Sequence, residues 1–118
     1  MKQFFKILSF TYLIILTIAL LIPIDFIAEE KQPSENTSFT IHLVLFFILY
    51  SVFYFSFLNK YNVLLFCVVF SVLVEVLQIF TSRGFQIFDI MFNLIGILVS
   101  FLFLFYFYKH RSYRKKFN

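Results

Sequence analysis

The chain has 118 residues, of which 62% are hydrophobic and only 14% are charged, and its mean hydropathy is +0.94. A water-soluble domain is nearer half apolar and a quarter charged, and one of this size has no core large enough for so many apolar side chains. The composition therefore excludes a soluble globular domain and predicts an integral membrane protein. The single cysteine, Cys67, excludes an intrachain disulfide.

Two apolar spans separated by a polar loop make up the N-terminal half. The first span, residues 7–27, is too long for a signal peptide and no small-residue cleavage site follows it, so we expect a retained transmembrane helix. Residues 28–38 are rich in Glu, Ser and Asn and are predicted to form a loop. The second span, residues 39–58, has one ionisable residue, His42, in its first turn.

Two further apolar spans, residues 63–82 and 86–108, precede a strongly basic tail, residues 109–118. The chain shows no internal repeat and no linker long enough to separate domains. The sequence therefore predicts a single all-α domain, residues 1–118, built as an integral membrane bundle of four transmembrane helices. Because the connections are short, neighbouring helices are expected to run antiparallel.

The distribution of Lys and Arg predicts the orientation in the membrane. Four spans place both termini on one side, and only Lys31 and Arg83 of the ten basic residues fall on the other side. Basic residues in short flanking segments favour the cytoplasm, so both termini are predicted to be cytoplasmic. The basic tail is expected to lie against anionic lipid headgroups rather than to bind nucleic acid, because it is short and has no folded partner domain.

Polar residues interrupt the third and fourth spans at helical spacing. On the third span they are Ser71, Glu75, Gln78 and Ser82. On the fourth span they are Asp89, Asn93, Gly96 and Ser100. Each set follows steps of three or four residues and so shares one helix face. Because a short turn containing Arg83 joins the two helices, we expect the two faces to meet, with Gly96 allowing a close approach.

The order and spacing of these residues resemble the signature of the VanZ-like membrane proteins. The matching residues are Glu75-x-x-Gln78, Arg83 and Asp89-x-x-x-Asn93-x-x-Gly96. His42 stands where family members carry a His, but the Asp-Lys that often precedes it is absent, and Ser100 replaces a common Gly. The resemblance covers residues 38–104 and implies a multi-pass protein of a bacterial cytoplasmic membrane. The founding member of the family is associated with low-level resistance to the glycopeptide teicoplanin.

Six polar side chains are the predicted binding residues of a pocket that opens to the cell exterior: His42, Glu75, Gln78, Arg83, Asp89 and Asn93. Gly96 and Ser100 are predicted to have structural roles. A carboxylate below the membrane surface is costly unless it is protonated, hydrated or paired. Arg83 is the expected partner of Glu75, either directly or as a bridge to Asp89.

Three interpretations of the pocket remain open. In the first, it binds a cell-envelope lipid, a lipid-linked cell-wall precursor or a glycopeptide, and so lowers susceptibility to envelope-active agents. In the second, which we favour less, the protein is a membrane enzyme that uses His42 or Glu75 as an acid or base on a lipid-linked substrate. In the third, the polar residues only fix helix packing in a structural subunit of a membrane complex.

The expected partners are membrane lipids, with no nucleic acid and no cofactor, and the oligomeric state is left open. His42, Glu75 and Asp89 could in principle hold a divalent ion, but no metal site is expected, because the sequence contains no closely spaced pair of ligands. Its two histidines, His42 and His110, fall on opposite sides of the membrane in the predicted topology.

Overall fold

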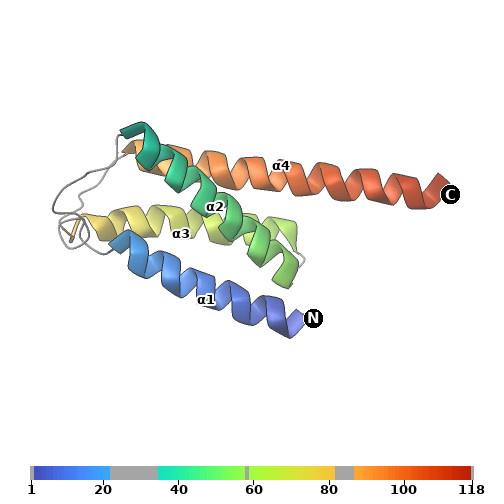
Figure 1. Ribbon diagram of the computed structural model, residues 1–118, viewed down its shortest axis with the longest axis horizontal. Helices are drawn as coiled ribbons and strands as arrows, with labels where there is room; N and C mark the ends of the chain where they lie inside the picture. Colours follow the sequence, from blue (N-terminus) through green and yellow to red (C-terminus); the bar gives the residue numbers. More distant parts are fainter. Residues whose placement is uncertain (1, 22–34, 58, 82–86, 118) are drawn as a thin grey trace.

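The computed structural model describes residues 2–21, 35–57, 59–81 and 87–117 (Figure 1). They form four helices: α1 (Lys2–Leu21), α2 (Glu35–Phe57), α3 (Lys60–Gln78) and α4 (Ile87–Phe117). Each helix is long and apolar enough to cross a membrane. The predicted all-α membrane bundle of four helices is confirmed.

Consecutive helices run antiparallel, and both chain termini lie at the same end of the bundle (Figure 1). This topology makes α2 parallel to α4, and these two helices form the most extensive helix–helix contact. α2 also packs against α1 and α3, and α3 packs against both α1 and α4. The second helix is therefore the central element of the bundle, although its neighbour in the largest contact is not adjacent in the sequence.

Several helix ends differ from the predicted spans. α1 begins at Lys2 rather than at residue 7, and α2 begins at Glu35 rather than at residue 39. The start of α3 has a local cause, because the Asn59 side chain accepts a hydrogen bond from the backbone N–H of Asn62 at 3.3 Å and caps the helix. The predicted ends at residues 27, 58 and 82 and the predicted start at residue 86 lie outside the described residues.

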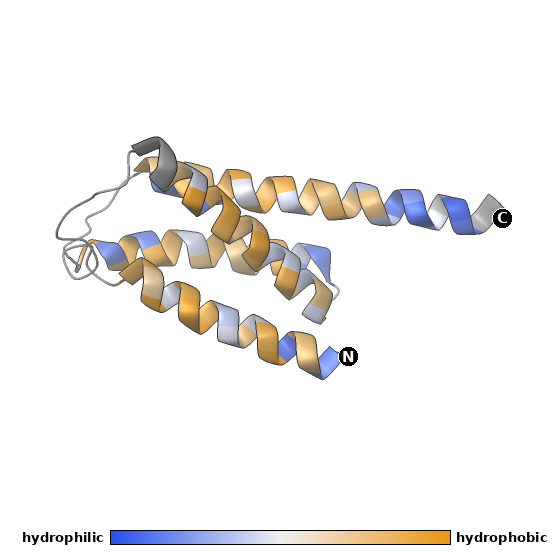
Figure 2. Ribbon diagram, viewed as in Figure 1, coloured by the Kyte–Doolittle hydropathy of each residue, from blue (hydrophilic) through white to orange (hydrophobic). Residues whose placement is uncertain are grey.

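The largest difference concerns the basic segment predicted as a tail. α4 continues without interruption to Phe117, so residues 109–117 are helical. Figure 2 shows this hydrophilic continuation beyond the apolar part of the helix, on the same side as the N-terminus. The basic residues of this segment are exposed: Lys109, Arg111, Arg114 and Lys115.

The core of the bundle is apolar and is centred on α2. Phe46 and Leu49 are fully buried, and Tyr50 is 1% exposed. Large apolar side chains are also exposed on all four helices. Figure 2 shows that hydrophobic residues extend along most of each helix. Such an apolar surface suits contact with lipid and not with water. A helix can lie in lipid because its backbone polar groups are hydrogen-bonded within the segment.

Hydroxyl groups link neighbouring helices inside this apolar bundle. Ser9 of α1 is hydrogen-bonded to Ser56 of α2, and the Ser56 hydroxyl also donates to the Phe5 carbonyl at 2.7 Å. Tyr12 donates to the Leu45 carbonyl, again at 2.7 Å. Small and hydroxylated residues permit close packing and cross-helix hydrogen bonds in lipid, so these pairs fix α1 against α2.

Candidate functional site

Four of the predicted binding residues gather at the end of the bundle opposite the termini, and we call them the polar cluster: His42, Glu75, Asp89 and Asn93. They come from the first half of α2, the last turns of α3 and the first turns of α4. Their exposed fractions are 4%, 0%, 7% and 0%, respectively. The polar faces predicted on the third and fourth helices are therefore turned inward, and His42 joins them from a third helix.

Asn93 is the centre of the polar cluster. Its Oδ1 lies 2.9 Å from Nδ1 of His42, and its Nδ2 donates to Oε1 of Glu75 at 3.5 Å. The other ring nitrogen of His42, Nε2, lies 3.7 Å from Oδ2 of Asp89. The Asn93 amide of α4 thus connects α2 to α3, and the His42 imidazole faces both Asn93 and Asp89 of α4.

Two features of the helices suit a carboxylate at Asp89. It lies in the first turn of α4, where the unpaired backbone N–H groups and the helix dipole favour negative charge. His42 faces it from α2, and a protonated imidazole would complete an ion pair. Asp89 Oδ1 is nevertheless buried without a hydrogen-bond partner in the part of the chain that the structure describes.

Gln78 does not join the polar cluster. Its side-chain Nε2 donates to the backbone carbonyl of Leu20 at 2.8 Å, and the residue is 2% exposed. Leu20 lies in the last described turn of α1, so Gln78 links α3 to this part of α1. Arg83, the predicted partner of Glu75, lies outside the described residues.

Gly96 and Ser100 pack against α2, which corrects the expectation that Gly96 brings the third and fourth helices together. A Cβ atom on Gly96 would overlap the Leu43 carbonyl oxygen and lie 3.0 Å from its carbonyl carbon. Ser100 is hydrogen-bonded to Ser51 of α2 at 2.8 Å. The close approach therefore belongs to the parallel pair α2 and α4, and it brings His42 within reach of Asn93.

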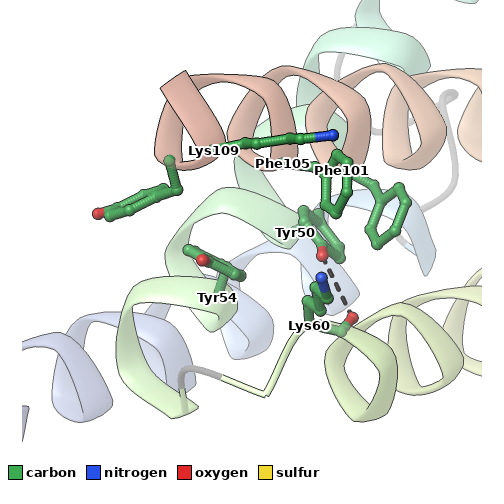
Figure 3. A pocket seen from close by; sticks show the side chains of 7 residues that line it. Tyr50, Tyr54, Lys60, Phe101, Phe105 and Lys109 are labelled. Atoms are coloured by element: carbon green, nitrogen blue, oxygen red, sulfur yellow. Dashed lines mark hydrogen bonds between the residues drawn. The ribbon is translucent and has the colours of Figure 1, made fainter. Parts of the chain in front are cut away.

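A second polar site lies toward the other end of the bundle, in a cavity of about 250 Å³ between α2, α3 and α4 (Figure 3). We call it the rim pocket; its lining residues are Tyr50, Tyr54, Lys60, Phe101, Phe105, Tyr108 and Lys109. The ammonium groups of Lys60 and Lys109 lie 4.4 and 5.9 Å from the ring centre of Phe105. The Tyr50 hydroxyl donates to the Lys60 carbonyl at 3.2 Å.

Sequence reasoning did not identify the rim pocket. Its aromatic residues are embedded in a chain with 21 Phe and seven Tyr, so none of them stands out by residue type. The available signal was the pair of lysines at the ends of apolar spans, where long side chains extend toward the membrane surface.

Four apolar helices around a buried polar cluster define a multi-pass membrane protein whose ionisable core residues are concentrated at one end. The chain belongs to the VanZ/LLP1 family, whose family model matches residues 2–108. This confirms the family resemblance drawn from the spaced polar motif. Comparisons with curated proteins and with solved structures gave no match.

Proposed function

We propose that this VanZ/LLP1 protein lowers the susceptibility of a bacterium to glycopeptide-type or other envelope-active agents. It does so by binding a cell-envelope lipid, a lipid-linked precursor or the agent itself at the polar cluster. The observation that carries the proposal is the burial of four hydrogen-bonding or ionisable side chains at one end of an otherwise apolar bundle. Family membership supports the link to resistance.

The chemistry of the polar cluster favours a ligand with hydroxyl or ammonium groups. Glu75 and Asp89 supply carboxylate oxygens, and Asn93 supplies both a donor and an acceptor. Asp89 Oδ1, with no hydrogen-bond partner in the described part of the chain, is an acceptor that a ligand would satisfy. Sugar hydroxyls and amines of envelope molecules have the matching donors.

The orientation expected from the basic residues supports a role at the outer leaflet. Lys2, Lys6, Lys60 and the basic continuation of α4 all lie toward the end that carries the termini. The positive-inside rule assigns that end to the cytoplasm. The polar cluster then faces the outer leaflet, where lipid-linked precursors and envelope-active agents meet the membrane.

One pair of atoms favours a second candidate function. His42 Nε2 and Asp89 Oδ2 are buried and 3.7 Å apart, and a catalytic acid–base contact of this length can shorten to a hydrogen bond when a substrate binds. In this alternative the protein is a membrane enzyme that acts on a lipid-linked substrate. Conversion of a labelled lipid extract by the purified protein, lost in His42→Gln, would favour the enzyme over the binding protein.

The test of the proposed function compares abundance with susceptibility. Asp89→Asn keeps the size of the side chain but removes its charge, so we expect the resistance phenotype to be lost while the membrane level of the protein stays near wild type. Ser100→Ala, a change of another buried polar residue on the same helix, is the matched control and should keep resistance. Full resistance in Asp89→Asn at wild-type abundance would refute a functional polar cluster.

A further inference from the structure

Three potential metal ligands converge inside the polar cluster. His42, Glu75 and Asp89 each place one ligand atom within 4.8 Å of those of the other two. They belong to α2, α3 and α4, so the site exists only in the folded bundle. Sequence spacing gives no sign of it, because no two of the three residues are close neighbours in the chain.

The hydrogen bonds of Asn93 orient the imidazole for such a role. Because the amide nitrogen of Asn93 donates to Glu75, the amide oxygen is left to face Nδ1 of His42. An amide oxygen only accepts hydrogen bonds, so Nδ1 must carry a proton. Nε2 is then the nitrogen that faces Asp89, and in neutral histidine it has a free lone pair. Metal-binding histidines are held in this way by a hydrogen bond to the second ring nitrogen.

The distance between the ligand atoms of His42 and Asp89 suits one shared ion better than a direct hydrogen bond. The 3.7 Å between His42 Nε2 and Asp89 Oδ2 exceeds hydrogen-bond length. Two ligands at about 2.0–2.2 Å from one tetrahedral or octahedral ion lie about 3–4 Å apart. Among the residues that the structure describes, the buried Oδ1 of Asp89 has no hydrogen-bond partner, which is a second sign that a cation belongs beside this carboxylate.

We infer that His42, Glu75 and Asp89 bind one divalent transition-metal ion, with Zn²⁺ as its first candidate. One imidazole and two carboxylates suit Zn²⁺ or Mn²⁺, whereas Mg²⁺ and Ca²⁺ prefer oxygen ligands alone. Three protein ligands leave a coordination position open, as in catalytic rather than structural zinc sites. An oxygen of a headgroup, either a sugar hydroxyl or a phosphate oxygen, is the class of ligand that this position accepts.

This ion site rests on the geometry of the three side chains and does not depend on the proposed resistance function. The primary measurement is therefore the metal content of the full-length, tag-free protein in detergent micelles, after Zn²⁺ loading and dialysis. We expect close to one ion per chain. Loading with Co²⁺ should give visible absorption bands of a nitrogen- and oxygen-ligated ion, and these bands need no variant for their interpretation.

Variants then assign the ion to the site. His42→Gln and Asp89→Asn should each weaken Zn²⁺ binding at least about tenfold. His110→Gln removes the other histidine of the chain, which is exposed near the far end of α4, and should bind Zn²⁺ as the wild type does. Size-exclusion chromatography of each variant shows whether the bundle remains folded.

Two results would overturn the inference. The first is wild-type protein with no bound ion above background and no Co²⁺ bands, which would leave the polar cluster as a network held by protons and hydrogen bonds. The second is equal Zn²⁺ binding by His42→Gln and wild type. Zinc binding by the wild type that is weakened in Asp89→Asn, together with full resistance of that variant, would keep the ion site and refute the proposed function, so the two failures are distinguishable.

Discussion

The two ends of the bundle hold their charged groups in opposite ways. In the polar cluster, side chains from three helices are buried and contact one another, as Asn93 contacts both His42 and Glu75. In the rim pocket, Lys60 and Lys109 extend over the ring of Phe105 and keep their ammonium groups near the surface. The first arrangement depends on the relative position of three helices, whereas the second depends mainly on the reach of two flexible side chains.

This difference suggests different roles: the polar cluster has the features of a binding site, and the rim pocket has those of the membrane surface. Buried ionisable groups in lipid are costly and need partners at fixed positions, so the polar cluster should tolerate few substitutions. Lysines at the membrane surface remain hydrated and contribute little to stability, so the rim pocket should tolerate many. The predictions below are ordered from the largest expected effect to the smallest.

The largest effect is all-or-none and concerns which end faces outward. A cysteine at Glu30, a position outside the described residues, should react with a membrane-impermeant thiol reagent in intact cells, whereas one at Ser112 should not. Native Cys67 is fully buried and provides the unreactive background. Labelling of Ser112→Cys alone would reverse the orientation and assign the polar cluster to the cytoplasmic side.

The next effect is expected at Gly96, on which the close approach of α2 and α4 depends. Gly96→Leu should push α4 away from the Leu43 backbone, separate His42 from Asn93 and lower the protein level in membranes several-fold. Val99→Leu places the same leucine side chain at a position exposed on the outside of α4 and is the control. Quantitative immunoblots of membrane fractions measure both, and equal levels would show that helix contact is not tight at Gly96.

Loss of the central amide should have an intermediate effect. Asn93→Leu removes the acceptor for His42 Nδ1 and a donor to Glu75, and we expect it to destabilise the protein by about 1–3 kcal/mol in detergent. Thermal unfolding followed by circular dichroism is the measurement. Unchanged stability would mean that these hydrogen bonds contribute nothing to the bundle.

The smallest effect is expected at the rim pocket. Lys60→Gln and Lys109→Gln each remove a cation from the ring of Phe105, yet the change in unfolding free energy should stay within about 0.5 kcal/mol. The same thermal measurement serves for both. A loss as large as that of Asn93→Leu would remove the distinction drawn between the two ends.

The sequence predicts much of the fold because each helix is long and apolar, and the polar residues of α3 and α4 repeat at helical spacing. It also predicts which residues turn inward: Glu75, Asp89 and Asn93 are all buried. The sequence does not predict which helix packs against the face of α4 that carries Gly96. Chain adjacency favours α3, but α2 and α4 run parallel and make the larger contact, as the packing of Gly96 against Leu43 shows.

The same limitation explains the separate position of Gln78 and the unexpected convergence of metal ligands. Gln78 shares a helix face with Glu75 but lies about one turn further along α3. At that level the face contacts α1, and the Leu20 carbonyl accepts the hydrogen bond from Gln78. His42 is the only His, Asp, Glu, Lys or Arg residue among Phe39–Phe57, so no spacing of such residues within α2 indicates its direction. Both outcomes depend on how helices are arranged around the bundle, and that arrangement comes from packing over the whole chain.

The uninterrupted length of α4 has a mechanical consequence. At about 1.5 Å per residue, its 31 residues span about 46 Å, while the hydrocarbon layer is about 30 Å thick. Asp89 and Asn93 lie near one end of this rod, and Arg114 and Lys115 lie near the other. If a ligand at the polar cluster tilted α4 as a rigid helix, its cationic end would move along the opposite lipid surface. The helix would then couple ligand binding on one side of the membrane to a movement on the other.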